Sequence, residues 1–324
     1  MKRKFEKGSN DSLSEDITRK FESLQKEKEE NDELKHAWID ELQSIARQKY
    51  PKASLVLIGS SANMFGFKAS DCDLTLISGE RFVYGLHALD NIEKLLPNSK
   101  YTTTLVHGAK VPILKIKDKE NSLEADINSE CERNIRHTYL VRCYALLDPR
   151  VQPLGIIVKL WAKNAGIINQ RDHKLSGFTL LLLYIYYLQA GCSPPVVPLL
   201  QVDYPSLFSS SRQTSALIDQ LKTKKLPDEL KNFKSSNKQT LGELFVGFFR
   251  FYANFNWSSK VVSISRSNAY VSNNRPRMKI EDPYEMGGNC ARGIYESLSF
   301  MQIKNAFTKA LRKIEDSMDL DSVL

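Results

Sequence analysis

The 324-residue sequence has few cysteines and no long hydrophobic run. Its five cysteines are odd in number, widely spaced and without a CxxC pair, which indicates neither a disulfide framework nor a structural zinc site. The longest apolar stretch, FTLLLLYIYYL at 178–188, is shorter than the ~20 residues that span a bilayer, so it predicts a buried helix and no membrane partner. The cysteines indicate reduced thiols in a cytosolic or nuclear protein, and the charged start MKRKFEKGSNDSLSED lacks the apolar core of a secretory signal. We expect a cytoplasmic protein.

Several well-known catalytic motifs are also missing. No GxxxxGK[ST] P-loop, GxGxxG dinucleotide turn, HExxH metal pair or GxSxG serine elbow occurs in the sequence. P-loop, Rossmann, zincin and serine acyl-transfer chemistries therefore have no support. Positive charge, by contrast, is in surplus: the net charge is +8 with a pI of about 9.1, which favours a polyanionic partner such as nucleic acid.

The chain changes its hydrophobic pattern along its length. A helical period covers 11–48, and a second helix is expected across 80–96. Short apolar or alternating runs predict strands, the last two of them as a hairpin: 54–59, 73–77, 111–117 and 123–128. From about 132 onward the pattern is helical, apart from a Pro-, Ser- and Lys-rich stretch at 193–240 that we expect to be irregular. The length and these patterns predict two domains, one mixed and one helical.

Two aspartates follow a Gly-Ser-Ser turn in GSSANMFGFKASDCDL, residues 59–74. Side chains two residues apart in a strand share a face, so Asp71 and Asp73 are expected to project together. Their charges repel unless a cation lies between them, and Mg²⁺ typically takes one or two carboxylates with phosphates and water. An isolated pair of this kind is also typical of a turn cap followed by an exposed strand end.

Three further features favour the metal interpretation. The turn at Gly59 and Ser60 follows a strand directly, and its N–H groups and hydroxyls suit a triphosphate. Asp126 lies on a separate predicted strand that can pair beside the first two acids. Lys159 and Lys163 share one helix face and can grip phosphates as a pair, although lysines at this spacing are usually solvated.

Three carboxylates that hold a pair of metal ions suit in-line nucleotidyl transfer. In this hypothesis Asp71 and Asp73 hold both ions, which are Mg²⁺ or Mn²⁺. Asp126 holds the ion that activates the nucleophile.

The stretch at 59–74 resembles the GS…DxD signature of the polymerase-β-like nucleotidyltransferase superfamily. Further blocks are similar, in order, to those of the cytoplasmic poly(A) polymerases and terminal uridylyltransferases: AKVPILKIKDKENSLEADIN, RHTYLVRCYALLDPRVQPLGIIVKLWAK, LSGFTLLLLYIYYLQ, LGELFVGFFRFY and IEDPYEMGGNCAR. The resemblance implies an α+β enzyme with a mixed-sheet nucleotidyltransferase domain at 50–145. It also implies a mainly helical central (PAP-associated) domain formed by 1–49 and 146–324, with nucleotide and RNA 3′ end meeting between the two.

The resemblance implies roles for single residues as well. Ser60, Lys159 and Lys163 match triphosphate-binding positions. Phe178 stands where the family usually places a tyrosine that stacks on the base, so stacking is kept and a hydrogen bond is lost. The other positions implied to bind the nucleotide are Gly59, Ser176, Gly177, Asp282, Glu285, Gly288 and Asn289. Arg292 is expected to reach RNA phosphate, to seal the cleft or to be an ordinary surface arginine.

Two departures from the family pattern bear on specificity. The family commonly has Asn before Thr at a ribose contact, whereas this chain has His137 before Thr138, which puts that contact in doubt. Uridylyltransferases usually carry a uracil-selecting His immediately before the Asn that matches Asn289, and Gly288 stands there instead. A flat pocket without a base-edge reader accommodates the larger purine, whereas selecting uracil needs buried hydrogen-bonding groups. We therefore favour ATP over UTP.

The sequence as a whole predicts a template-independent RNA 3′-terminal nucleotidyltransferase, a cytoplasmic poly(A) polymerase that uses ATP. A terminal uridylyltransferase that uses UTP by the same mechanism is the alternative. A non-catalytic RNA-binding scaffold is a third possibility, disfavoured because an unfilled set of carboxylates costs stability. A small nucleotide or an antibiotic as acceptor is disfavoured by the RNA-type helical blocks. Since no RNP motif, KH loop or zinc finger is visible, we expect an RNA-binding partner protein to supply targeting.

Overall fold

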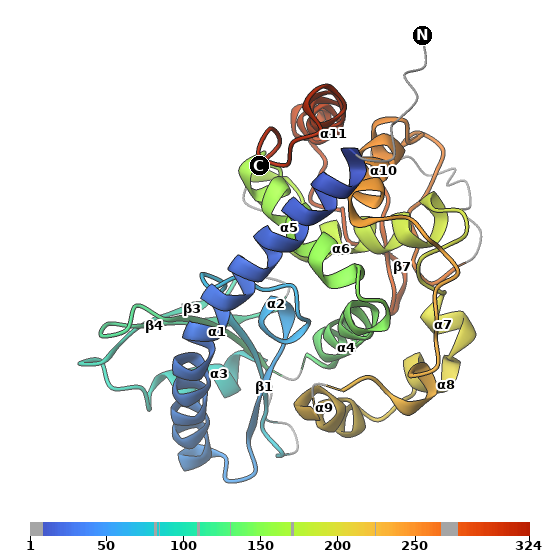
Figure 1. Cartoon of the computed structure of the whole chain (residues 1–324). Coiled ribbons are helices and arrows are strands. Elements are labelled where there is room, and N and C mark those ends of the chain that lie inside the picture. The colour runs from blue at the N-terminus through green and yellow to red at the C-terminus, as the bar shows by residue number, and fades with distance from the viewer. Residues whose placement is uncertain are drawn as a thin grey trace. The chain divides into compact units, whose positions relative to one another are not determined.

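The computed structural model describes the following residues: 9–80, 83, 85–108, 111–129, 131–169, 172–223, 225–266 and 278–324. They form two compact units, drawn together in Figure 1. The sheet unit comprises Leu24–Arg142 and Gln213–Lys225. The helical unit comprises Met1–Ser23, Cys143–Arg212 and Leu226–Leu324. We describe each unit by itself.

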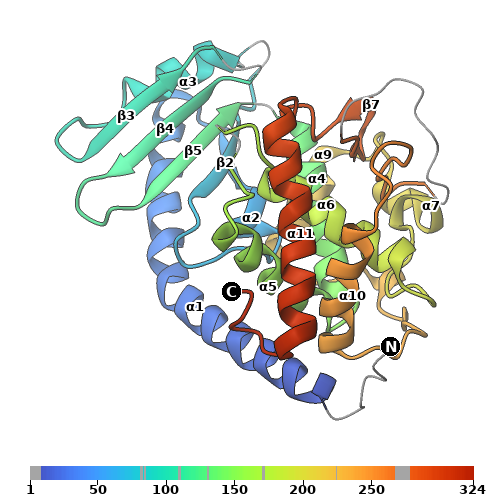
Figure 2. The same cartoon turned by 90° about the horizontal axis from the view of Figure 1, so that it is seen from above.

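A five-stranded mixed sheet forms the centre of the sheet unit, with strand order β1-β2-β5-β4-β3. Figure 2 shows β2, β5, β4 and β3 following one another in this order. The strands are β1 (Ser54–Leu57), β2 (Cys72–Ile77), β3 (Tyr101–Val106), β4 (Ile113–Asp118) and β5 (Glu124–Ser129). β2 and β5 run parallel, whereas the other neighbouring pairs are antiparallel. The predicted hairpin is confirmed as β4 and β5. The edge strand β3 was not predicted.

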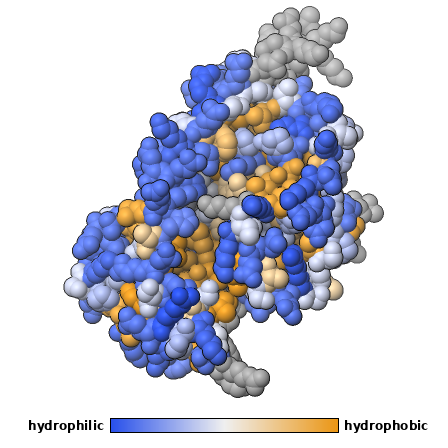
Figure 3. Space-filling model, turned by 60° about the horizontal axis from the view of Figure 1, so that its bottom comes forward, coloured by the Kyte–Doolittle hydropathy of each residue, from blue (hydrophilic) through white to orange (hydrophobic). Residues whose placement is uncertain are grey.

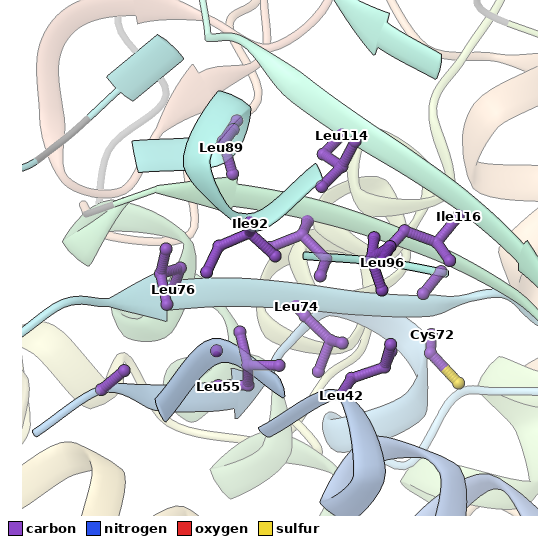
Figure 4. Close-up of a cluster of buried hydrophobic side chains, with 14 of the residues drawn as sticks. Leu42, Leu55, Cys72, Leu74, Leu76, Leu89, Ile92, Leu96, Leu114 and Ile116 are labelled. Carbon is purple, nitrogen blue, oxygen red and sulfur yellow. The ribbon is translucent and has the colours of Figure 1, made fainter. Parts of the chain in front are cut away.

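Two helices cover this sheet with apolar side chains, α1 (Ser9–Lys49) and α3 (Gly85–Glu93). Trp38, Leu42 and Ala46 of α1 recur every four residues, so they form one stripe along the helix. The stripe joins Leu74 of β2 and Ile92 of α3 in one buried cluster, part of which Figure 4 shows. This packing groups residues 24–49 with the sheet, whereas the division expected from the sequence assigned all of 1–49 to the helical domain.

The remaining elements of the sheet unit are short or shared. They are α2 (Gly59–Ala62), α9 (Thr214–Thr223) and α4 (Glu132–Leu147), which continues into the helical unit. α9 lies in the stretch expected to be irregular, and so do α7 (Leu200–Asp203) and α8 (Pro205–Phe208) of the helical unit. The expectation for 193–240 was therefore wrong at these places. Only Leu217 and Leu221 of α9 are buried, so its apolar stripe is too short to stand out in the sequence.

The helical unit is built around four longer helices: α5 (Val151–Asn164), α6 (Gly177–Tyr186), α10 (Leu241–Ala253) and α11 (Ser297–Ser317). α6 ends in one π-helical turn, Tyr187–Gly191. A capping box fixes the start of α10, because the Thr240 hydroxyl accepts from the Glu243 N–H while the Glu243 carboxylate accepts from the Thr240 N–H. Aromatic rings of α5, α10 and α11 meet in the core, among them Trp161, Phe249 and Phe307.

Two strands complete the helical unit as a small hairpin, β6 (Glu281–Asp282) and β7 (Glu285–Asn289). No helix among the described residues is long and apolar enough to cross a membrane. Hydrophilic residues cover much of the face drawn in Figure 3, and hydrophobic residues show between them, as is usual for globular surfaces.

Candidate active site

The three predicted aspartates lie on or beside two neighbouring strands of the sheet unit. Asp73 in β2 is the direct cross-strand partner of Asp126 in β5. Asp71 comes two residues before Asp73, immediately before β2 begins. The expectation that Asp126 lies on a strand paired beside the first acids is confirmed in its geometry. The three carboxyl groups thus come from the beginning of β2 and the position on β5 directly across from it.

Burial and neighbouring acids together raise the pKa of the Asp71 carboxyl. Partial desolvation raises the pKa of its carboxyl above the ordinary value, although the residue remains accessible at the surface. The negative charges of Asp126 and Glu124 raise this pKa further, and the more weakly acting cations Lys115 and Lys35 lower it. A deprotonated Asp71 is therefore held at a cost that a bound cation would relieve.

An ammonium group lies against Asp126 in this structure. Lys115, the cross-strand neighbour of Asp126 on β4, places its Nζ 2.8 Å from Oδ1 and 2.5 Å from Oδ2 of that carboxylate. The pair is partly solvated, so it contributes at most about 1 kcal/mol. Within the described ranges, no three acidic, His or Cys side chains are already arranged around one metal position. The ammonium shows that Asp126 accepts a cation with both oxygens, and a metal would compete with it.

The Gly-Ser turn packs directly against Asp73. Gly59 has a φ of +63°, and a Cβ at this residue would lie only 2.4 Å from Oδ2 of Asp73. Glycine alone fits both this conformation and this close approach. The Gly59 N–H donates to Oγ1 of the buried Thr138 at 3.0 Å, and the Ser61 hydroxyl donates to the main-chain oxygen of Asp71 at 3.0 Å. Turn and acids therefore form one connected structure.

These bonds refine the expectations for Gly59 and for Thr138. The Gly59 N–H donates to Thr138, so in this arrangement it is not offered to a phosphate. The Thr138 hydroxyl is itself engaged, because it also donates to the main-chain oxygen of Asn134 at 2.7 Å. Ser60, in the first turn of α2, is half-buried and remains the predicted phosphate ligand of this turn.

Within the helical unit, Lys159 reaches the start of α6. A Cβ at Gly177 would lie 3.6 Å from Cε of Lys159. The Ser176 hydroxyl caps α6 by accepting from the Thr179 N–H at 3.0 Å, and the half-buried Phe178 lies in the same first turn. The structure thus brings four predicted nucleotide-binding positions together at one helix end. Lys163, one turn further along α5, is exposed.

The β6–β7 hairpin holds the remaining predicted positions. Asp282 pairs with Glu285 across the hairpin. The Asn289 side chain fastens it, because Oδ1 accepts from the N–H groups of Ile280 and Ala291, both at 3.0 Å. Asp282 and Glu285 also line a hollow of about 400 Å³ in the helical unit. The exposed Arg292 follows the hairpin directly.

Gly288 is more than a missing side chain. A Cβ at this position would lie 2.9 Å from the main-chain oxygen of Glu285 and 3.0 Å from Cβ of Asp282. The hairpin therefore closes over Gly288, and any larger residue there must displace the two acids.

Sequence reasoning missed two residues of the sheet unit that contact the candidate site, Lys35 and Lys115. It named Thr138 only beside a ribose contact and missed the bond that this residue accepts from the Gly59 N–H. The alternation of VPILKIK places Lys115 on the polar face of its strand, but only the register of β4 with β5 reveals its partner. No comparable signal exists for Lys35, which lies in a helix rich in lysine and glutamate.

A mixed sheet with paired aspartates on adjacent parallel strands, beside a Gly-Ser turn, defines a nucleotidyltransferase catalytic domain of the polymerase-β type. Comparisons with known proteins agree. The family model described as "Poly(A) RNA polymerase, mitochondrial-like, central palm domain" matches residues 13–146, and "Cid1 family poly A polymerase" matches residues 240–287.

Curated relatives match nearly the whole chain. Poly(A) RNA polymerase GLD2-B of Xenopus laevis is 34% identical over 97% of this chain and 62% of its own length. GLD2 of Homo sapiens is 32% identical over 97% of this chain and 66% of its own length. The chain therefore spans slightly less than two thirds of the length of these relatives.

Solved structures show the same fold over nearly the whole chain. The structure of the GLD-2/RNP-8 complex contains a chain that is 30% identical, with a TM-score of 0.82 and 98% of each chain covered. Cid1 in complex with its short product ApU is 27% identical, with a TM-score of 0.80, covering 97% of this chain and 98% of Cid1. The chain belongs to the family of RNA nucleotidyltransferases that contains the GLD2 poly(A) polymerases and Cid1, as its sequence blocks predicted.

Proposed function

We propose that the protein is a template-independent RNA 3′-terminal nucleotidyltransferase that adds AMP from ATP. The observation that carries the proposal is the register of Asp73 with Asp126 on adjacent parallel strands, with Asp71 two residues away and the Gly59 turn against Asp73. This arrangement supplies the carboxylates that nucleotidyl transfer requires. Membership of the family supports the same reaction.

Asp71, Asp73 and Asp126 would hold two divalent cations, Mg²⁺ or Mn²⁺. Two observations support the fit: the raised pKa of the Asp71 carboxyl beside other acids, and the grip of both Asp126 oxygens on an ammonium group. Such ions, when bound, lower the pKa of an attacking hydroxyl and neutralise charge on leaving pyrophosphate.

The chain's own residues would bind and orient the substrates. In the sheet unit, the Ser60 hydroxyl donates to a phosphate oxygen, while the packing of Gly59 on Asp73 fixes that carboxylate. In the helical unit, Lys159 and Lys163 neutralise phosphate charge.

Three groups of the helical unit would bind the rest of the substrates. Phe178 stacks on the base, in line with its half-buried position in the first turn of α6. The hairpin acids Asp282 and Glu285 face the base or orient their loop, and Arg292 offers charge to RNA phosphate.

ATP is the proposed nucleotide because no base-edge reader projects from Gly288. The curated relatives matched over 97% of this chain are poly(A) polymerases, which supports adenine. Cid1, named a poly(U) polymerase, supports uridylyl transfer as the second candidate. A histidine-to-asparagine mutant of Cid1 has been crystallised with MgATP, in keeping with histidine as a determinant of base choice in that protein.

A protein partner and a cytoplasmic location complete the proposal. The GLD-2/RNP-8 complex supports a partner for targeting, because that relative assembles with another protein. The free thiols of Cys72 and Cys192 fit a reducing compartment.

The test is extension of a short RNA primer with Mg²⁺ and each of the four nucleoside triphosphates separately. We expect the longest products with ATP. Preference for UTP would replace the adenylyl assignment by the uridylyl one, whereas failure of folded protein to extend RNA with any triphosphate would refute RNA nucleotidyl transfer.

A further inference from the structure

One lysine of α1 is buried beneath the loop that carries the first aspartate. Lys35 is only 7% exposed, and its Nζ donates to the main-chain oxygen of Lys68 at 2.8 Å and of Ser70 at 2.6 Å. Burying an ammonium group is costly unless its hydrogen bonds and its charge are used. Both of these acceptors lie in the three residues before Asp71.

The loop at 67–70 is fastened at several further points. The Phe67 N–H donates to the Ser70 hydroxyl at 2.9 Å, and the Ser70 N–H donates to the Phe67 oxygen at 3.0 Å. Asn31, one turn before Lys35 on α1, donates to the Lys68 oxygen at 3.3 Å. Since the Ser61 hydroxyl donates to the main-chain oxygen of Asp71, the backbone is held both before and at that residue.

The helix that carries Lys35 is anchored in the hydrophobic core of the sheet unit. Trp38 and Leu42, the next apolar residues of the same helix, are 4% and 2% exposed within the sheet cluster. The helix therefore cannot turn without breaking the core.

We propose that Lys35 is a positioning residue for the metal site: by clamping the loop at 67–70 from α1, it sets the Asp71 carboxylate for a divalent cation. The proposal rests on the function proposed above for the three aspartates. It makes a buried residue of α1, a helix without a catalytic motif, a determinant of metal affinity.

The test compares three variants of the full chain. Lys35→Met keeps the aliphatic stem and removes the ammonium, Lys35→Arg keeps a cation, and Lys26→Met removes an exposed lysine of the same helix. Mn²⁺ binding is titrated by electron paramagnetic resonance without RNA or nucleotide. We expect the Mn²⁺ Kd of Lys35→Met to rise by about 10- to 100-fold, as for other residues that orient metal ligands. Lys35→Arg should recover part of the loss, and Lys26→Met should match the wild type.

A second readout separates positioning from a merely structural role. In RNA extension, Lys35→Met should lower kcat at limiting Mn²⁺, recover at high Mn²⁺ and leave KM for RNA unchanged. Ser70→Ala, which removes the hydroxyl bond to Phe67 and keeps the oxygen that Lys35 binds, should weaken Mn²⁺ binding in the same direction but less. If Lys35→Met does not fold, Ser70→Ala and Lys35→Arg test the positioning role instead.

Two negative results have different meanings. If folded Lys35→Met binds Mn²⁺ as the wild type does, the positioning role is wrong. If Lys35→Met does not fold, the role is wrong when folded Lys35→Arg and folded Ser70→Ala both keep the wild-type Mn²⁺ affinity. If the wild type itself neither binds Mn²⁺ nor extends RNA, the proposed function fails instead.

Discussion

The contact between Gly59 and Asp73 makes the effect of one methyl group calculable. An alanine Cβ at Gly59 would lie 2.4 Å from Oδ2 of Asp73, whereas ordinary contacts begin at 3.4 Å, so the carboxylate must retreat by about 1 Å. A misplacement of about 1 Å can lower a catalytic rate about 100-fold, which corresponds to about 2.7 kcal/mol in the activation barrier. We therefore expect Gly59→Ala to lose about two orders of magnitude in kcat.

Gly85 supplies the matched control, because it has the same φ of +63° and no atom lies within 4 Å of the place that an alanine methyl group would take. Alanine in this conformation costs about 1–2 kcal/mol, offset by about 0.4–1 kcal/mol from the less flexible unfolded chain. In urea unfolding, Gly59→Ala should therefore lose at least as much stability as Gly85→Ala, because its methyl group also displaces Asp73. Only Gly59→Ala should lose kcat in RNA extension with saturating ATP and Mg²⁺. Wild-type kcat in folded Gly59→Ala would refute the placement of Asp73 in the catalytic site.

Three further predictions concern the base, the metal-free site and the hairpin. Phe178→Ala should raise KM for ATP about 5- to 150-fold, equivalent to about 1–3 kcal/mol of stacking, and Phe178→Tyr should not; an unchanged KM in the alanine variant would place the ring away from the base. The pKa of the Asp71 carboxyl is raised in the folded protein, so its ionisation destabilises the metal-free native state as pH rises from 3.8 through that higher pKa. In urea unfolding with EDTA, the free energy of unfolding of Asp71→Asn should increasingly exceed that of the wild type across this pH window. Parallel dependences of the two unfolding free energies on pH would contradict the shift. Gly288→Ala should alter the ATP-to-UTP preference by displacing the hairpin acids, whereas Gly293→Ala, with nothing within 4 Å, should not; identical preferences would show that the hairpin does not read the base.

Local patterns predicted much of the sheet, because alternation and turn residues are properties of short segments. The hairpin of β4 and β5 and the strand that carries Asp126 were predicted from LEADIN and its neighbours. The edge strand β3 was missed because YTTTLV has little apolar alternation. The grouping of residues 24–49 with the sheet could not be predicted either, since a helical stripe shows that a face is buried but not against which element.

The candidate site shows the same limit at the level of single residues. The spacing of Asp71 and Asp73 is enough to predict them as site residues, but the ion pair of Lys115 with Asp126 depends on strand register. Lys35 lies in a helix whose composition is typical of a solvated face, but it is buried because the loop before Asp71 folds over it. In the sequence, Gly288 was notable only because it replaces the histidine of uridylyltransferases. The structure adds a steric reason for glycine, because a Cβ there would clash with the hairpin.

The most direct measurement compares RNA extension by wild type, Asp126→Asn and Glu124→Gln, with ATP and Mg²⁺ and with folding checked by circular dichroism. Glu124 lies two residues earlier on the same strand, is exposed and pairs with Lys117 at 2.8 Å, so it is the matched acidic control. We predict adenylate tails from wild type and Glu124→Gln and none from folded Asp126→Asn. Wild-type tails from folded Asp126→Asn would contradict the three-aspartate site on which the proposed function depends.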